Sequence, residues 1–190
     1  MYQGVGLRII GGDLRGKKLN SIRGAKIRPT ADRLRESIFN ILGLRVRDTV
    51  VLDLFAGTGA LGLEALSRGA DSAVLIENDK RALSLIERNI RSCDFYDKAR
   101  TIKWDIKRNL NCIKSTRPAF GLVFMDPPYN GKTIRPSLLN LHRSGSMEED
   151  ALIIVEHSPL EAIPEDILGL TIVDQRRYGK TVVSFLNFVE

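Results

Sequence analysis

The feature that most constrains the fold is a strand, glycine loop and helix in succession near residues 49–69. "TVVLDLF" is a short apolar run, which is typical of a buried parallel strand. "ALGLEALSRGA" then predicts a helix that ends near Gly69. Between them, Gly57, Gly59 and Gly62 match the pattern GxGxxG. Glycines here allow a tight turn and let a ligand approach the backbone closely, so the unit predicts an α/β fold with a binding loop.

The rest of the chain continues the alternation of strand and helix. Apolar runs predict further strands at residues 72–77, 99–104, 120–126 and 150–157. Helical patterns follow them at residues 80–93, 106–115, about 133–141 and 160–167. Two strand-like runs joined near Tyr178-Gly179 predict a C-terminal β-hairpin. The expected architecture is a mostly parallel sheet with helices on both faces and an antiparallel hairpin at its end.

The first 48 residues differ from the rest in charge. They hold eleven Lys/Arg and four Asp/Glu, whereas residues 49–190 hold eighteen Lys/Arg and nineteen Asp/Glu. The excess positive charge of the chain, +6 overall, is therefore in the N-terminal segment. That segment predicts two short strands around Gly11-Gly12-Asp13 and a helix within residues 26–44. A basic extension favours a polyanionic partner, and a solvated surface is the alternative.

Composition excludes several other classes of protein. The apolar fraction is 43%, enough for one core, and no apolar run reaches the ~20 residues that a membrane helix needs. The N-terminus lacks the apolar stretch of a signal peptide, so a soluble, cytoplasmic protein is expected. Cys93 and Cys112 have no zinc-ligand spacing, and we expect no metal site. Residues 1–6 belong to no pattern.

Two acidic residues indicate what the glycine loop binds. Glu77 ends the next strand, where a carboxylate can accept hydrogen bonds from both hydroxyls of a ribose. Asp53, at the end of the first strand, suits a cationic ligand such as S-adenosylmethionine (SAM) and suits a pyrophosphate poorly. A nicotinamide or flavin cofactor, or a tight turn without any ligand, are the alternatives.

The tetrad Asp126-Pro127-Pro128-Tyr129 directly follows the fourth strand of this α/β pattern. It could be an ordinary turn, but it resembles the tetrad of methyltransferases that modify amino groups on planar, conjugated systems. The Asp126 carboxylate and the Pro127 carbonyl could each accept one N–H of such a group, so that its lone pair faces the methyl donor. Tyr129 could stack on the base, a contact worth ~1–3 kcal/mol. No metal is required.

Several segments together resemble one family. "LRIIGGDLRGKKL", "IRPTADRLRESIFNIL", "DLFAGTGALGLEALSRGA", "FMDPPY", "VEH" and "RRYGKTVVSFL" are similar to the RsmD family of bacterial 16S ribosomal RNA guanine-N2 methyltransferases. The resemblance implies a class I, Rossmann-like fold with a seven-stranded sheet, SAM as cofactor, and 16S RNA in the small subunit or its assembly intermediate as partner. It divides the chain into an RNA-contacting extension (residues 1–48) and a SAM-binding domain (residues 49–190). We expect a monomer that does not bind membranes.

The resemblance also implies roles for individual residues. The catalytic residues would be Asp126, Pro127, Pro128 and Tyr129. The cofactor site would comprise Asp53, Phe55, Ala56, Gly57, Thr58, Gly59, Glu77, Asn78, Asp105 and Ile106. The candidates for phosphate contact are Arg8, Arg15, Lys17, Lys18, Arg28, Arg33 and Arg35. Asp105 could bind the adenine amino group or cap a helix, and Asn78 replaces a more usual lysine.

Other functions remain open from the sequence. The same tetrad serves enzymes that methylate adenine N6 in DNA or RNA, and related enzymes act on a protein glutamine. A non-catalytic RNA-binding module with a relic pocket is a further alternative, and a nicotinamide oxidoreductase is the most distant one.

Overall fold

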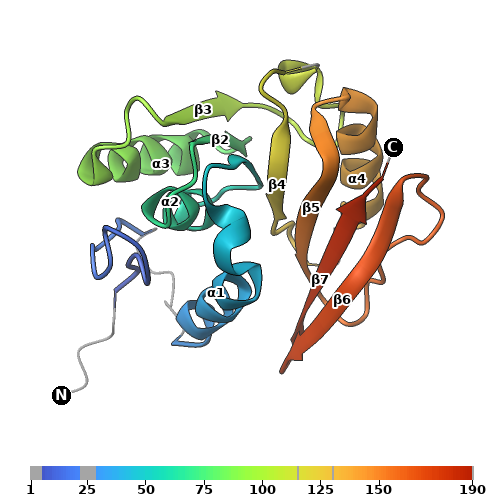
Figure 1. Cartoon of the computed structure of the whole chain (residues 1–190), viewed down its shortest axis with the longest axis horizontal. Coiled ribbons are helices and arrows are strands. Elements are labelled where there is room, and N and C mark those ends of the chain that lie inside the picture. Colours follow the sequence, from blue (N-terminus) through green and yellow to red (C-terminus); the bar gives the residue numbers. More distant parts are fainter. Residues whose placement is uncertain (1–5, 22–28, 115, 130, 190) are drawn as a thin grey trace.

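The computed structural model describes residues 6–21, 29–114, 116–129 and 131–189, and within them it confirms the mostly parallel seven-stranded sheet. The strand order is β3-β2-β1-β4-β5-β7-β6 (Figure 1). The strands are β1 (Val50–Leu54), β2 (Ser72–Glu77), β3 (Ala99–Lys103), β4 (Phe120–Met125), β5 (Met147–His157), β6 (Leu170–Tyr178) and β7 (Thr181–Phe188). The α-helices are α1 (Pro29–Leu42), α2 (Ala60–Ser67), α3 (Lys80–Cys93) and α4 (Ile134–Ser144), and η1 (Gly43–Val46) and η2 (Asn111–Ile113) are short 3-10 helices.

The order of the strands places a crevice at the carboxyl end of β1. The chain adds β2 and β3 on one side of β1 and then returns to pair β4 with its other side. Ligands of open α/β sheets bind at such a reversal, beyond the carboxyl ends of the strands. The predicted C-terminal hairpin is also present, since β7 pairs antiparallel with both β5 and β6.

Two apolar clusters cover the two faces of the sheet. One joins α1, α2, α3 and the N-terminal segment to alternate strand residues such as Val51, Phe124 and Ile154. The other joins α4, η2 and the loop before β6 to the intervening residues, such as Leu52 and Val123. Successive residues of a strand point to opposite faces of the sheet, so neighbouring residues of one strand pack into different apolar clusters.

Two predicted helices are absent from the described residues, and the sequence predictions there were wrong. At 106–115 only η2 forms, because the Asp105 and Asn109 side chains accept hydrogen bonds from the backbone of Lys107 and Asn111. Such local bonds compete with a helix. At 160–167 the chain is irregular, since Pro164 cannot donate a backbone hydrogen bond and restricts the residue before it.

The N-terminal segment 6–21, hereafter the arm, is less regular than two strands. A single antiparallel bridge joins Arg8 and Lys18, and the residues between them form turns. The backbone of this turn is bound by α2 instead of by a strand: the N–H groups of Ile10 and Gly11 donate to Glu64 at 2.7 and 2.8 Å. The arm thus packs on α2. None of the described helices is long and apolar enough to cross a membrane.

Candidate functional site

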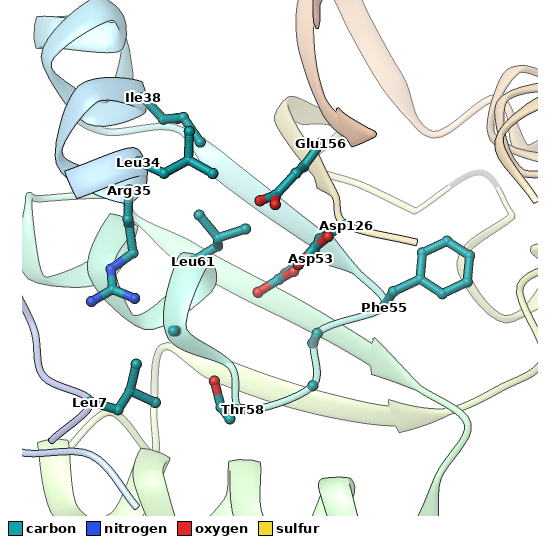
Figure 2. Close-up of a pocket in the computed structure, with 13 residues that line it drawn as sticks. Leu7, Leu34, Arg35, Ile38, Asp53, Phe55, Thr58, Leu61, Asp126 and Glu156 are labelled. Atoms are coloured by element: carbon teal, nitrogen blue, oxygen red, sulfur yellow. The ribbon is translucent and has the colours of Figure 1, made fainter. Parts of the chain in front are cut away.

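A cleft of about 350 Å³ lies at the carboxyl ends of β1, β4 and β5, between the sheet and α1 (Figure 2). This volume is in the range of small-ligand sites. Residues of the arm, of α1, of the glycine loop and of three strand ends line the cleft: Leu7, Leu34, Arg35, Ile38, Asp53, Phe55, Ala56, Gly57, Thr58, Ala60, Leu61, Asp126 and Glu156. The glycine loop and the Asp126 tetrad, 69 residues apart at Gly57 and Asp126, therefore meet in one cavity.

Three carboxylates converge in the cleft because they occupy equivalent positions at the ends of three neighbouring strands, on the same face of the sheet. Val51, Phe124 and Ile154 face the α1–α2 layer, and each is followed two residues later by an acidic side chain. Two positions along a strand return to the same face, so Asp53, Asp126 and Glu156 all face that layer. Figure 2 shows the three side chains pointing toward one another. No ion pair joins any of them to a cation among the described residues.

Asp53 is fully buried beneath the loop. Its Oδ2 accepts a hydrogen bond from the N–H of Gly62 in the first turn of α2, at 2.9 Å. Burial raises the pKa of Asp53 to about 7, the hydrogen bond from Gly62 opposes this, and the charge of Glu77 adds to it. A Cβ at Gly62 would lie 3.3 Å from Oδ2, which explains the glycine at this position. A cation placed beside Asp53 would stabilise its ionised form.

Asp126 and Glu156 have pKa values displaced in the same direction. Burial raises the pKa of Asp126 well above its usual value, and the charges of Glu156 and Asp53 raise it further. Asp126 is nevertheless exposed at the mouth of the cleft, so solvent moderates this shift. Burial likewise raises the pKa of Glu156, against the hydrogen bond that Tyr129 donates. Both groups therefore hold a proton more readily than ordinary carboxylates.

Tyr129 is fixed by two strands of the C-terminal half. Its hydroxyl donates to Oε1 of Glu156 at 2.7 Å and lies 2.9 Å from Oγ1 of Thr181 on β7. Burial and the charges of Glu156 and Asp126 raise the pKa of Tyr129, and the hydrogen bond with Thr181 opposes this shift. The phenol therefore stays protonated and remains a donor. Tyr129 as a whole is 45% exposed, which leaves part of its surface available to a partner.

Glu77 holds the glycine loop in shape. Its carboxylate accepts from the N–H of Gly57 at 3.0 Å, and from the N–H groups of Asn78 and Asp79 at 2.7 and 2.9 Å. Since a carboxylate offers about four acceptor positions, one remains for a ligand hydroxyl. Phe55, which lines the cleft, has φ +62°, a backbone conformation that is strained for a bulky residue and typical of binding loops.

The remaining predicted cofactor residues lie apart from the cleft. Asn78 and Asp105 line a second hollow of about 430 Å³, together with Trp104. Gly59 and Ile106 are buried and line neither cavity. Glu77 links residues of both hollows. Its carboxylate accepts from the backbone N–H of Gly57, which lines the cleft, and from that of Asn78, which lines the second hollow.

Arg35 does not have the surface position expected of a phosphate contact. Its side chain is 7% exposed and its guanidinium donates to the Arg8 carbonyl, with ion pairs to Asp32 at 3.3 Å and to Glu64 at 3.6 Å. Burial lowers the pKa of Arg35, and the two carboxylates oppose that shift. This prediction is corrected: the α1 helix buries Arg35 against α2, where it holds elements together.

The other predicted RNA contacts are distributed over the arm and α1. Arg15, Lys17 and Lys18 are exposed on the arm, and Arg33 is exposed on α1. Arg8 is exposed too, but its guanidinium lies 3.5 Å from Asp32. Arg28 lies outside the described residues.

The sequence reasoning missed Glu156, although it noted the segment that contains it. The signal was available: Glu156 follows Ile154 by two residues near the carboxyl end of a predicted strand, as Asp126 follows Phe124. Leu7, Leu34 and Ile38, the apolar wall of the cleft, were also missed, because only the packing of the arm and α1 on the sheet brings them there.

Comparisons with known proteins identify the family of this chain. The model of a family described as "Conserved hypothetical protein 95" matches residues 7–187. The ribosomal RNA small subunit methyltransferase D of Escherichia coli (strain K12) is 36% identical over 158 residues, covering 83% of this chain and 78% of that protein. YlbH of Bacillus subtilis (strain 168) is 33% identical over 178 residues, covering 94% and 97%. The solved structure of yhhF from Escherichia coli has a TM-score of 0.85 at 34% identity, covering 96% and 97%.

Proposed function

The chain belongs to the conserved hypothetical protein 95 family, which includes the RsmD-type ribosomal RNA methyltransferases, and we propose that it methylates the N2 amino group of a guanine in 16S ribosomal RNA. At the coarser level it is a SAM-dependent methyltransferase of small-subunit ribosomal RNA. The single observation that supports methylation of an amino group is the convergence of Asp126 with the glycine loop in one cleft, and the resemblance to the RsmD family favours guanine N2 over adenine N6.

The charges of the cleft fit the cofactor. SAM carries an ammonium and a sulfonium, and when bound it supplies a methyl group activated by the positive sulfur. Asp53, Asp126 and Glu156 have no cationic partner among the described residues, and their raised pKa values indicate that they lack compensating positive charge. These two cationic groups, placed among the three carboxylates, would stabilise the ionised forms of the carboxylates.

We assign the cofactor residues on this basis. Asp53 would face the methionine end, with Phe55, Ala56, Gly57 and Thr58 as the surrounding wall. Glu77 would use its remaining acceptor position for a ribose hydroxyl. The hollow at Asn78, Asp105 and Trp104 would hold the adenine, with Gly59 and Ile106 as buried support.

The tetrad would act on the exocyclic nitrogen. This nitrogen is a poor nucleophile because its lone pair is delocalised into the ring. If the Asp126 carboxylate and the Pro127 carbonyl each accept one N–H, the nitrogen is held pyramidal and its lone pair is directed to the methyl group. As the N–C bond forms, the bond between the methyl group and sulfur would break and leave S-adenosyl-L-homocysteine. One N–H proton must also leave, and the raised pKa of Asp126 suits it to accept that proton. Pro128 would stiffen the loop, and Tyr129 would stack on the base.

The RNA would be held by the extension, residues 1–48, while residues 49–190 carry the chemistry. Arg8, Arg15, Lys17, Lys18 and Arg33 would contact phosphates, which gives affinity without sequence specificity. We propose that the enzyme acts as a monomer.

Labelled methyl transfer to small subunits that lack the modification, followed by nucleoside analysis, tests the proposal. We expect N2-methylguanosine, and N6-methyladenosine or no product would contradict it. Asp126→Ala should reduce transfer by about 10²- to 10⁴-fold, the range for a group that handles the proton, while SAM binding persists. Equal activity of the variant and the natural enzyme would refute the role of Asp126.

A further inference from the structure

We propose that Glu156 selects guanine over adenine by accepting a hydrogen bond from N1–H of the target base, an inference that rests on the proposed guanine-N2 methylation. Nothing in the sequence patterns gave Glu156 a role, yet its side chain projects into the cleft beside Asp126 (Figure 2).

The sheet fixes Glu156 next to Asp126. β4 and β5 are parallel neighbours with Met125 opposite Val155, so the residues that follow, Asp126 and Glu156, are level with each other at adjacent strand ends. Adjacent strands lie ~4.8 Å apart, so two side chains at neighbouring strand ends are close enough to reach the same edge of one base. A base that presents its amino group to Asp126 would therefore present the adjoining ring atom to Glu156.

Only one of the two oxygens of Glu156 is engaged by the described residues. Oε1 accepts the hydroxyl of Tyr129, whose position Thr181 also fixes, and no described residue hydrogen-bonds Oε2. The backbone of Glu156 is held as well, because it pairs with Val183 on β7. The second oxygen is thus an oriented acceptor directed into the cleft.

The chemistry of the two bases differs at this point. Guanine carries a donor, N1–H, beside its N2 amino group, whereas adenine carries a lone pair at N1 beside its N6 amino group. An oxygen acceptor at Glu156 would bind the guanine donor and repel the adenine lone pair. A site built to hydrogen-bond one edge strongly rejects an analogue that lacks the donor, because its own buried polar group is left unpaired.

The alternative is that Glu156 only positions Tyr129. Changing the target base distinguishes this positioning role from recognition of the base by Glu156. The target guanine is first mapped by nucleoside analysis, and small subunits are then reconstituted from 16S RNA with guanine or 2,6-diaminopurine at that position. Diaminopurine keeps the 2-amino group but has a lone pair at N1. Glu156→Gln offers that lone pair an N–H donor, and its amide oxygen can still accept from Tyr129.

We expect Glu156→Gln to lower kcat/KM on guanine by about 10- to 100-fold and to shift the preference toward diaminopurine. Tyr129→Phe should keep the natural preference for guanine while its rate falls. Glu149→Gln, an exposed change at the opposite end of β5, should match the natural enzyme. Thermal unfolding of each variant verifies that it is folded.

An unchanged ratio of guanine to diaminopurine in Glu156→Gln would overturn the inference, whether or not the rate or SAM affinity falls. The failure of the proposed function looks different: the natural enzyme would then form no N2-methylguanosine on the unaltered subunit.

Discussion

Glu64 on α2 and Asp126 after β4 are both carboxylates beside other charged side chains, but their surroundings differ. Glu64 has no exposed surface, yet the N–H groups of Ile10 and Gly11 and the Arg68 guanidinium donate to it, and Arg35 lies 3.6 Å away. Asp126 accepts no hydrogen bond from the described residues and faces two further carboxylates.

The comparison teaches where this protein uses charge for structure and where for binding. Around Glu64 positive and negative groups are matched, so the cluster holds the arm, α1 and α2 together. In the cleft the carboxylates have no cationic partner among the described residues, so their ionised forms are destabilised in the free protein. A bound cation would stabilise these ionised forms. Strained or electrostatically unfavourable groups of this kind gather at functional sites.

The largest expected effect follows from neutralising the matched cluster. Glu64→Gln leaves Arg35 buried with less opposing charge and removes an acceptor from the arm. Breaking a buried ion pair in this way costs about 3 to 5 kcal/mol. Urea unfolding of the variant should show this loss in the free energy of unfolding, and a loss below ~1 kcal/mol would mean that the cluster contributes little to stability.

The cleft predicts opposite pH dependences for SAM affinity and for stability. The pKa of Asp53 is raised from about 3.8 to about 7 on folding, so between these values the folded state binds more protons than the unfolded state. The contribution of Asp53 to the free energy of unfolding of the cofactor-free protein should therefore fall as pH rises from about 4 to 7. SAM binding favours the ionised form, so affinity should rise over the same range, by at most about tenfold per pH unit for one proton released.

Calorimetric titration of SAM between pH 5 and 7 tests this prediction, since the cofactor's own amino group titrates above that range. Asp53→Asn should flatten the part of the dependence that Asp53 contributes. An affinity that is constant with pH in the natural protein would show that the carboxylates do not compensate the charge of the cofactor.

A smaller effect of opposite sign is expected from neutralising the unmatched cluster. Asp126→Asn keeps the shape of the side chain and removes one of three like charges, so it should raise the free energy of unfolding by about 0.5 to 2 kcal/mol. Urea unfolding of Asp126→Asn and of Glu64→Gln at pH 8 measures the free energy of unfolding for both variants. Each variant replaces a carboxylate by its amide, so the two are a matched pair. Destabilisation by both changes would remove the distinction between the clusters.

The same distinction explains how much the sequence could predict. The fold followed from strand and helix periodicity, and Asp53 and Asp126 from their position after predicted strands. Arg35 could not be assigned, because the residue that buries it, Glu64, is 29 positions away and carries no local signal. The wrong helix at 106–115 has a local cause, since side chains such as Asp105 bind backbone groups that a helix would use.

The smallest expected effect per residue concerns the exposed charges of the arm. Glu64 fixes the backbone of Ile10 and Gly11, so Arg15 and Lys17 are carried on an anchored surface and can meet RNA phosphates in a defined position. Arg15→Glu with Lys17→Glu should weaken binding to 16S RNA and lower the slope of log K against log salt by about two, one for each phosphate contact. SAM affinity should not change. The control is Lys98→Glu with Lys114→Glu, which alters net charge equally at exposed positions that precede β3 and β4 and lie outside the extension. If the control lowers the slope as much as the arm variant does, RNA is attracted by overall charge and the arm is no specific contact surface.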